Sequence, residues 1–206
     1  MKTQSHVQTT RLVQIALLVA IILILAFTPL GYIRTLGLEI TLIVIPVTIG
    51  AIALGPVGGA ILGGVFGITS FIQCFGMSVF GATLLSINPW ATLIVTIIPR
   101  VLMGWLTGLL FAGLRKANIN KNITIALANL AGPLINTILF MSGIIIFFYQ
   151  TDYIQGFVDY FGTKSILSFV IAFVGINGLV ETVACFIVGT AITKAIDVYQ
   201  EKVQEI

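Results

Sequence analysis

Charged side chains are scarce in this sequence of 206 residues, which holds 10 Lys and Arg and 7 Asp and Glu, or 8% of the chain. Soluble domains carry about 25% charged residues, so this composition excludes an ordinary soluble domain. Hydrophobic residues make up 58% of the chain, and the mean hydropathy is +1.14. The apolar runs are too long and too continuous for barrel strands, which alternate with a period of two. The sequence therefore predicts an all-α membrane protein.

Residue types that support catalysis, metal binding or nucleic-acid binding are also few. No lysine follows a glycine, which excludes the Gly-Lys-Ser/Thr loop that binds ATP phosphates. His6 lies in the polar N-terminal stretch, and Cys74 and Cys185 lie in apolar runs without metal-ligand spacing. The net charge of +3 is spread over helix ends. We therefore expect no enzyme, no cofactor or metal in this chain, and no nucleic-acid partner.

The apolar runs predict a bundle of six membrane-spanning helices that forms one transmembrane domain, residues 1–206. Turn signals stand at Thr28-Pro29-Leu30-Gly31 and at Gly55-Pro56-Val57-Gly58. The first run is too long for a signal peptide and reads as a retained span. Three longer connections are predicted as loops, and the uncharged one, residues 73–89, suits a lid over a pocket. The predicted helices are residues 10–27, 41–54, 59–75, 90–115, 123–149 and 165–196.

The distribution of basic residues predicts the orientation in the membrane, because cytoplasmic loops are enriched in Lys and Arg. With six spans, both termini lie on one side, which we predict to be cytoplasmic. The three loops near residues 28–40, 74–90 and 150–165 are then external, and the chain is a multi-pass protein of the prokaryotic plasma membrane. The cytoplasmic side holds Lys2, Arg11, Arg115, Lys116, Lys121, Lys194 and Lys202, and the external side holds Arg34 and Lys164.

Small residues mark two faces at which another helix can approach closely. Gly59, Gly63 and Gly67 recur every fourth residue, so a neighbouring backbone is expected against them, from the first or second predicted helix. Ala16 and Ala20 form a second small pair on the first helix. This pair fits either a contact within the chain or a contact with a partner helix.

Arg100 lies near the middle of the predicted helix 90–115, where a permanent charge is expensive. The cost is estimated at about 2.5 to more than 10 kcal/mol, so the guanidinium needs a partner, a water-filled cavity or an anionic ligand. Few other polar groups lie at this depth. The candidate substrate-binding residues are Arg100, Asn136, Asn177, Glu181, Asn88 and Gln73, and Asn129 is a further buried polar residue.

Two interpretations of these residues remain open. In the first, Arg100 and Glu181 form an internal ion pair, and the asparagines bridge helices. In the second, Arg100 faces a pocket beneath the external loops and binds an anionic ligand, because a guanidinium can hold a carboxylate with two hydrogen bonds. Pro99 favours the pocket, since it frees a carbonyl one turn earlier in the helix.

Several motifs resemble the substrate-binding S components of energy-coupling factor (ECF) vitamin transporters, over essentially the whole chain. The most specific is Leu54-Gly55-Pro56-Val57-Gly58-Gly59-Ala60 at the turn between the second and third predicted helices. The others are Ile45-Pro46-Val47 before Gly50-Ala51, Pro99-Arg100-Val101-Leu102 with Gly104, and the Ala16/Ala20 pair. Ser70-Phe71-Ile72, Asn88-Pro89 and Pro99-Arg100 most resemble the pantothenate-specific subgroup.

The resemblance implies a substrate-binding subunit of an ABC-type importer rather than an enzyme. Such a subunit captures a vitamin from outside, here pantothenate, and docks through Ala16 and Ala20 on a membrane coupling protein (T component) that carries two ATPase subunits. Alternatives are an S component for riboflavin, folate or cobalamin, and a structural membrane subunit that transports nothing. A solitary secondary transporter is less supported, because no inverted repeat or relay of carboxylates is evident.

Overall fold

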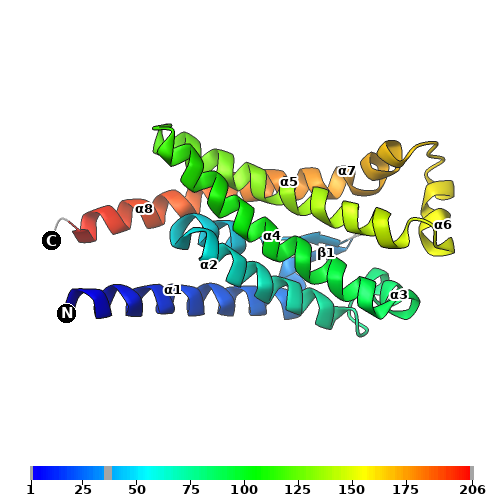
Figure 1. Ribbon diagram of the computed structural model, residues 1–206, viewed down its shortest axis with the longest axis horizontal. Helices are drawn as coiled ribbons and strands as arrows, with labels where there is room; N and C mark the ends of the chain where they lie inside the picture. The colour runs from blue at the N-terminus through cyan, green and yellow to red at the C-terminus, as the bar shows by residue number, and fades with distance from the viewer. Residues whose placement is uncertain (1, 35–38, 205–206) are drawn as a thin grey trace.

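Long helices dominate the fold of the chain, which we describe from a computed structural model (Figure 1). The structure describes residues 2–34 and 39–204, with side chains for residues 8–29, 31 and 41–198. Within this part, five helices are long and apolar enough to cross a membrane. They are α1 (Lys2–Phe27), α2 (Val44–Gln73), α4 (Pro89–Lys116), α5 (Lys121–Phe148), and α7 (Ile166–Ala184), which continues through a π-helical turn (Cys185–Gly189) into α8 (Thr190–Gln204).

The helix α2 is folded back on itself at Gly55, the position where the sequence predicts a turn. Gly55 has φ 79° and ψ −176°, which are not helical values. A Cβ placed on Gly50 would lie 2.0 Å from the Leu62 side chain, although these residues would be about 18 Å apart in a straight helix. The first half of α2 (residues 44–54) and its second half (residues 56–73) therefore run side by side in opposite directions. Five helices, with α2 counted once, are long enough to cross a membrane, so six spans stays a prediction.

Two of the predicted loops contain short helices instead. Residues 73–89 include α3 (Val79–Ile87), and residues 151–164 include α6 (Asp152–Tyr160). Both begin at a hydroxyl cap: the Ser78 side chain accepts from the backbone N–H of Gly81, and the Thr151 side chain accepts from that of Ile154. A Ser or Thr cap satisfies one of the orphan N–H groups of the first turn. The sequence predicted loops in these two segments and did not predict the short helices within them.

The predicted loop at residues 28–40 contains a short hairpin. A 3-10 turn (Pro29–Gly31) leads into β1 (Tyr32–Arg34), which pairs antiparallel with β2 (Glu39–Thr41), with Tyr32 opposite Thr41. The β-branched stretch Glu39–Pro46 suits an extended chain, but only its first three residues form β2, and the helix begins at Val44. The strand β2 lies against α7, which places the start of α2 beside the last long helix.

The glycine stripe of α2 packs mainly against α4, and not against α1. A Cβ on Gly63 would lie 2.1 Å from the Arg100 carbonyl oxygen, and one on Gly67 would lie 2.8 Å from the Ile97 Cα. Gly59 lies against Gly104 of α4 and also against Ala51 in the first half of α2. We expected a neighbour from the first or second predicted helix, and this is confirmed only for Gly59, which contacts Ala51 of the second predicted helix. The consequence is that α4, which carries Arg100, is in backbone contact with α2.

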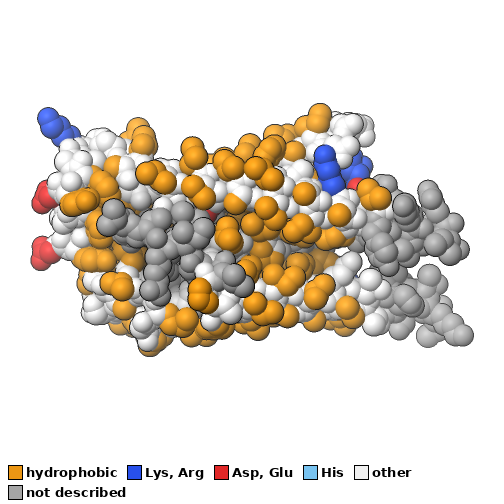
Figure 2. Space-filling model, turned by 180° about the vertical axis from the view of Figure 1, so that it is seen from behind, with side chains coloured by type: hydrophobic (Ala, Val, Ile, Leu, Met, Phe, Trp, Pro, Cys, Tyr) orange, Lys and Arg blue, Asp and Glu red, His pale blue; other side chains and the backbone are white. Residues whose placement is uncertain are grey.

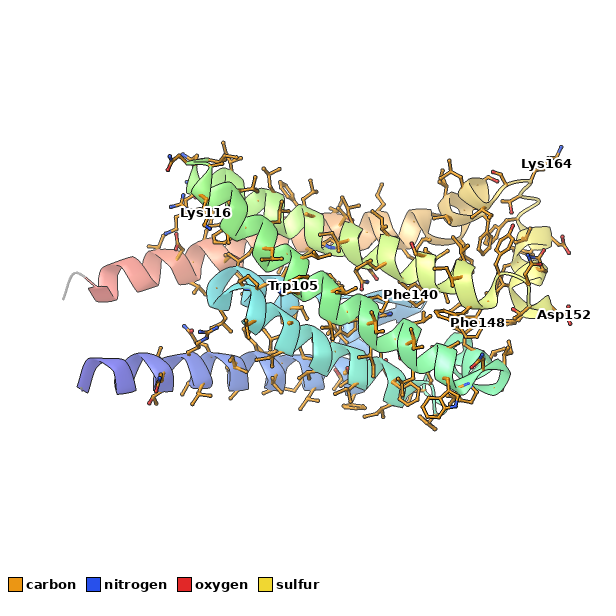
Figure 3. All side chains as sticks on the ribbon, in the orientation of Figure 1. Trp105, Lys116, Phe140, Phe148, Asp152 and Lys164 are labelled. Carbon is orange, nitrogen blue, oxygen red and sulfur yellow. The ribbon has the colours of Figure 1, made fainter. Side chains whose placement is uncertain are left out.

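The surface has the distribution of a membrane protein. Hydrophobic side chains cover the middle of the molecule, and the charged side chains that the structure describes gather near its two ends (Figure 2). Figure 1 shows both termini at one end, and α3 and α6 at the other. We call these the terminal end and the α3/α6 end. Lys116 lies at the terminal end, and Asp152 and Lys164 lie at the α3/α6 end (Figure 3).

Candidate functional site

A cavity of about 110 Å³ lies among α2, α3, α4, α5, α7 and the end of β2. Its polar lining comes from elements that are distant in sequence, so it exists only in the folded bundle. Apolar groups of α3 and α5 complete it, among them Phe80, Leu84 and Phe140. The polar residues that line the cavity are Thr41, Ser70, Gln73, Ser78, Thr96, Arg100, Asn136, Thr137, Asn177 and Glu181.

Five of the six predicted substrate-binding residues line this cavity; the exception is Asn88. Asn88 directly precedes α4 in the chain. Its side chain is exposed, and its Oδ1 accepts a hydrogen bond of 3.0 Å from the Ala91 N–H. Asn is a preferred N-cap residue and Pro89 follows at the first helical position, so the structure gives Asn88 a capping role. The residues that meet at the cavity are Gln73, Arg100, Asn136, Asn177 and Glu181.

Arg100 is held by a backbone carbonyl that Pro99 leaves available. Pro99 has no N–H to donate to Val95, which precedes it by four residues. The Arg100 Nη1 instead donates a hydrogen bond of 2.7 Å to the Val95 carbonyl oxygen. The freed carbonyl predicted from the Pro99-Arg100 pair is therefore present, and it positions the arginine next to it. This contact offsets part of the cost of the guanidinium at this depth.

Two aromatic rings lie on the guanidinium of Arg100. Its Cζ is 4.6 Å from the centre of the Phe140 ring and 5.6 Å from that of the Phe66 ring, distances within the range of cation–π attraction. Phe140 lies on α5, between the terminal end and the α3/α6 end of the molecule (Figure 3). It follows Asn136 by four residues, so helical spacing places both on one face. That spacing is the signal by which sequence reasoning could have found Phe140.

Glu181 binds the end of the hairpin. Its Oε1 accepts a hydrogen bond of 2.6 Å from the Thr41 N–H and one of 2.7 Å from the Thr41 hydroxyl. The open alternative was an internal ion pair between Glu181 and Arg100. The charge of Arg100 acts on Glu181 electrostatically, so this alternative stays open beside the ligand site. Glu181 is engaged with Thr41, a residue that sequence reasoning did not single out.

The asparagines and Gln73 add neutral hydrogen-bonding groups. Asn136 is only 6% exposed, and its Oδ1 accepts no hydrogen bond from the described residues. A buried acceptor without a donor is costly, so Asn136 presents an open position for a ligand or a water molecule. Asn177 and Gln73 are also buried, and the Gln73 amide nitrogen donates to the Ala26 carbonyl of α1. Asn129 lies outside the lining and donates to the Ile125 carbonyl.

The charges of the lining are balanced. Among the described residues that line the cavity, Arg100 is the one cation and Glu181 is the one carboxylate. The described residues contain no group of three or more His, Cys, Asp and Glu side chains able to hold a metal ion. The cavity can therefore offer an anion-binding fork, a hydrogen-bond-accepting carboxylate and neutral amides. These groups suit a small polar ligand with an anionic end.

The predicted partner-binding residues lie on the outside of the bundle. Ala16 and Ala20 of α1 are exposed, and they share their side of the helix with exposed Leu12 and Leu17. The alternative of a contact within the chain is therefore not what the structure shows for this pair. The side of α1 formed by residues 12, 13, 16, 17, 20, 21 and 24 is exposed and apolar, and we call it the α1 face.

The fold and the cavity are those of a helical membrane protein with a polar cavity between its helices. Comparison with known families gives the class: a sequence model described as "ECF transporter, substrate-specific component" matches residues 10–193. The chain belongs to this family of transporter components, which are not enzymes. This agrees with the resemblance seen in the sequence motifs.

Two relatives are similar over much of the chain. The "Pantothenic acid transporter PanT" of Lactococcus lactis subsp. cremoris is 32% identical over 167 residues, which cover 76% of this chain and 76% of the relative. The "Pantothenate transporter PanT" of Leuconostoc mesenteroides subsp. mesenteroides is 35% identical over 142 residues, 66% of each chain. Both names describe transport of the same vitamin.

Proposed function

We propose that this chain is the substrate-binding component of a pantothenate importer. The observation that carries the proposal is the polar cavity around Arg100, in a chain whose family is the substrate-specific component of ECF transporters. The names of the two relatives support pantothenate as the vitamin. The chain binds the vitamin, and ATP hydrolysis takes place in partner subunits.

The chemistry of pantothenate matches the cavity group by group. The vitamin has one carboxylate, two hydroxyls and one amide. The guanidinium of Arg100, which donates to the Val95 carbonyl and lies against the Phe140 ring, would bind the carboxylate through charge-assisted hydrogen bonds. Glu181 and the Oδ1 of Asn136 are acceptors for hydroxyl or amide donors, which explains why an anion-binding cavity also contains a carboxylate.

The proposed topology has six spans, with both halves of α2 counted as crossing the membrane. The first half is short for a full span of about 20 residues, so part of its length is completed by the hairpin and turn before it. Arg115, Lys116 and Lys121 lie at the turn between α4 and α5, at the terminal end, and Lys164 lies at the α3/α6 end (Figure 3). By the excess of basic residues, the terminal end is cytoplasmic, in the prokaryotic plasma membrane.

The proposed partners are a membrane coupling protein and two ATPase subunits. The α1 face supports this assignment, because its Ala16 and Ala20 are exposed and leave room for a partner helix to approach. The exposed Leu12 and Leu17 beside them would add apolar contact area. Capture from outside then depends on the cavity, and energy coupling depends on the α1 face.

The test is ligand binding by the purified chain. A thermal-shift screen against water-soluble vitamins should single out pantothenate, because a ligand at 100 times its dissociation constant adds about 2.7 kcal/mol of stability. The matched control is the alcohol analogue, in which CH₂OH replaces the carboxylate. We expect it to bind at least about tenfold more weakly, since it lacks the charge that Arg100 recognises. Stabilisation by riboflavin, folate or cobalamin instead, or by no vitamin, would overturn the assignment.

A further inference from the structure

Gly63 lies directly against the backbone of the proposed ligand anchor. A Cβ at position 63 would be 2.1 Å from the Arg100 carbonyl oxygen and 2.8 Å from its carbonyl carbon. Real Cβ contacts essentially never fall below 3.0 Å, and backbone atoms cannot rotate aside as the end of a side chain can. A side chain at position 63 would therefore separate α2 and α4 by about 1 Å at Arg100.

Close backbone contacts between α2 and α4 also lie on both sides of Gly63. Toward the terminal end, a Cβ on Gly59 would lie 2.2 Å from the Gly104 carbonyl oxygen, and one on Gly104 would lie 2.0 Å from that of Gly59. Toward the cavity, Gly67 lies against the backbone of Ile97. Three successive backbone contacts thus set the distance between α2 and α4 near Arg100. The position of Arg100 in the cavity follows from them.

The same face of α2 also supports the guanidinium. Phe66 follows Gly63 by three residues, is fully buried, and places its ring 5.6 Å from the Arg100 Cζ. Gly63 thus admits the backbone of the arginine while Phe66 packs against its side chain. The unpartnered Oδ1 of Asn136 lines the same cavity, and it independently indicates a ligand there.

We infer that Gly63 is a positioning residue for anionic ligands: its missing side chain sets where the Arg100 guanidinium stands in the cavity. This inference rests on the proposed function. A bidentate contact between guanidinium and carboxylate requires placement within about 0.5 Å. A shift of about 1 Å at Arg100 would therefore weaken recognition of a carboxylate more than recognition of neutral groups.

Gly64 provides a matched control in the same helix. A Cβ at position 64 would meet the Val101 side chain at 3.8 Å, an ordinary van der Waals contact. Gly63→Ala and Gly64→Ala give the same gain in helix propensity and add the same methyl group. They differ in whether that methyl group meets the backbone of α4.

The experiment measures affinities of the purified variants for pantothenate and for its alcohol analogue. Gly63→Ala should weaken pantothenate binding by about tenfold or more, and should lower the affinity ratio of pantothenate to the alcohol by about fivefold. Gly64→Ala should stay within about twofold of the unmodified chain for both ligands. A general packing defect would weaken both ligands equally. An unchanged ratio in Gly63→Ala would overturn the inference.

Two further measurements cover a variant that does not fold and a chain that does not bind. If Gly63→Ala is not recovered as a folded protein, Gly67→Ala decides, because its Cβ would lie 2.8 Å from the Ile97 Cα and would disturb the same helix contact less severely. We expect a smaller loss that is again selective for pantothenate, and an unchanged ratio counts against the inference. If the unmodified chain binds neither ligand, the proposed function fails. A ligand-free structure of Gly63→Ala then shows whether Arg100 lies about 1 Å farther from residue 63 than in the unmodified chain. An unchanged separation would refute the positioning role.

Discussion

Thr41 and Glu181, which are 140 residues apart in the chain, are joined by two hydrogen bonds that end on one carboxylate oxygen. The backbone N–H of Thr41 donates at 2.6 Å, and its hydroxyl donates at 2.7 Å. Both residues line the cavity. The end of the hairpin is therefore connected to α7 at the site itself, and the wall of the cavity depends on this link.

The first prediction concerns Glu181. Glu181→Gln keeps an oxygen that can accept both bonds, whereas Glu181→Ala leaves the Thr41 N–H without its acceptor. Removing one partner of a buried bond costs about 1–3 kcal/mol. We expect Glu181→Ala to lower the free energy of unfolding by about 2 kcal/mol more than Glu181→Gln does. Thermal unfolding in detergent measures this difference, and equal stability of the two variants would show that Thr41 does not depend on Glu181.

The second prediction concerns the charge and the shape of Arg100. Arg100→Ala should weaken pantothenate binding by about 100-fold, since charge-assisted hydrogen bonds contribute about 1.5–3 kcal/mol each. Arg100→Lys keeps the charge but lacks the planar fork, so we expect an intermediate loss of about tenfold. Arg115→Ala, at an exposed position in the last turn of α4, is the control and should bind normally. Isothermal titration compares the four proteins, and unaltered binding by Arg100→Ala would remove the arginine from the site.

The third prediction separates two buried threonines in the half of the bundle toward the termini. The Thr48 Oγ1 lies 2.9 Å from the Ile45 carbonyl oxygen, 3.1 Å from the Asn129 Oδ1 and 3.2 Å from the Cys185 Sγ. The Thr107 Oγ1 is equally buried and has no hydrogen-bond partner among the described residues. Valine in place of either threonine exchanges the hydroxyl for a methyl group of similar volume.

We therefore expect opposite outcomes for Thr48→Val and Thr107→Val. The first should lower the free energy of unfolding by about 1–3 kcal/mol, because it leaves the polar partners of Thr48 unsatisfied. The second should leave stability unchanged or raise it, because an unpartnered buried hydroxyl is lost. Chemical denaturation in detergent measures both. A large loss in Thr107→Val would mean that this hydroxyl has a partner such as an ordered water molecule.

The polar residues of the cavity were predictable because polar groups are rare in apolar helices. Arg100, Asn136, Asn177 and Glu181 stand out in the sequence, and the cost of burying them is a physical reason to expect a common site. The sequence alone did not distinguish an ion pair from a ligand site. The structure adds the Thr41 contacts of Glu181, which arise from an approach of β2 to α7, and no sequence pattern indicated them.

Other features were not predictable, for reasons of spacing and of tertiary packing. The helices α3 and α6 are short, and their glycines, aromatics and caps resemble those of loops. Asn88 has the residue type of a binding group, but its place before Pro89 makes it a helix cap. The glycine stripe predicts close packing but does not say against which helix. Only the fold shows that its neighbour is α4 at Arg100.

The last prediction tests the α1 face, and it separates binding from energy coupling. Ala16→Trp and Ala20→Trp place large side chains on an exposed surface that is distinct from the residues lining the cavity. Ligand affinity of the purified chain should therefore stay within about twofold, since no packing within the bundle is disturbed. Vitamin uptake in cells that contain the coupling protein and ATPases should be lost, because tryptophan prevents close approach of a partner helix.

The matched control for this surface is Ile146→Trp on α5, where the side chain is 73% exposed. This position also faces away from the bundle, so a tryptophan there tests for general effects of a bulky residue on insertion and stability. We expect uptake by Ile146→Trp to remain near that of the unmodified chain. Loss of binding in Ala16→Trp would show that α1 supports the fold of the cavity rather than the docking of a partner. Normal uptake by both Ala16→Trp and Ala20→Trp would place the coupling surface elsewhere on the bundle.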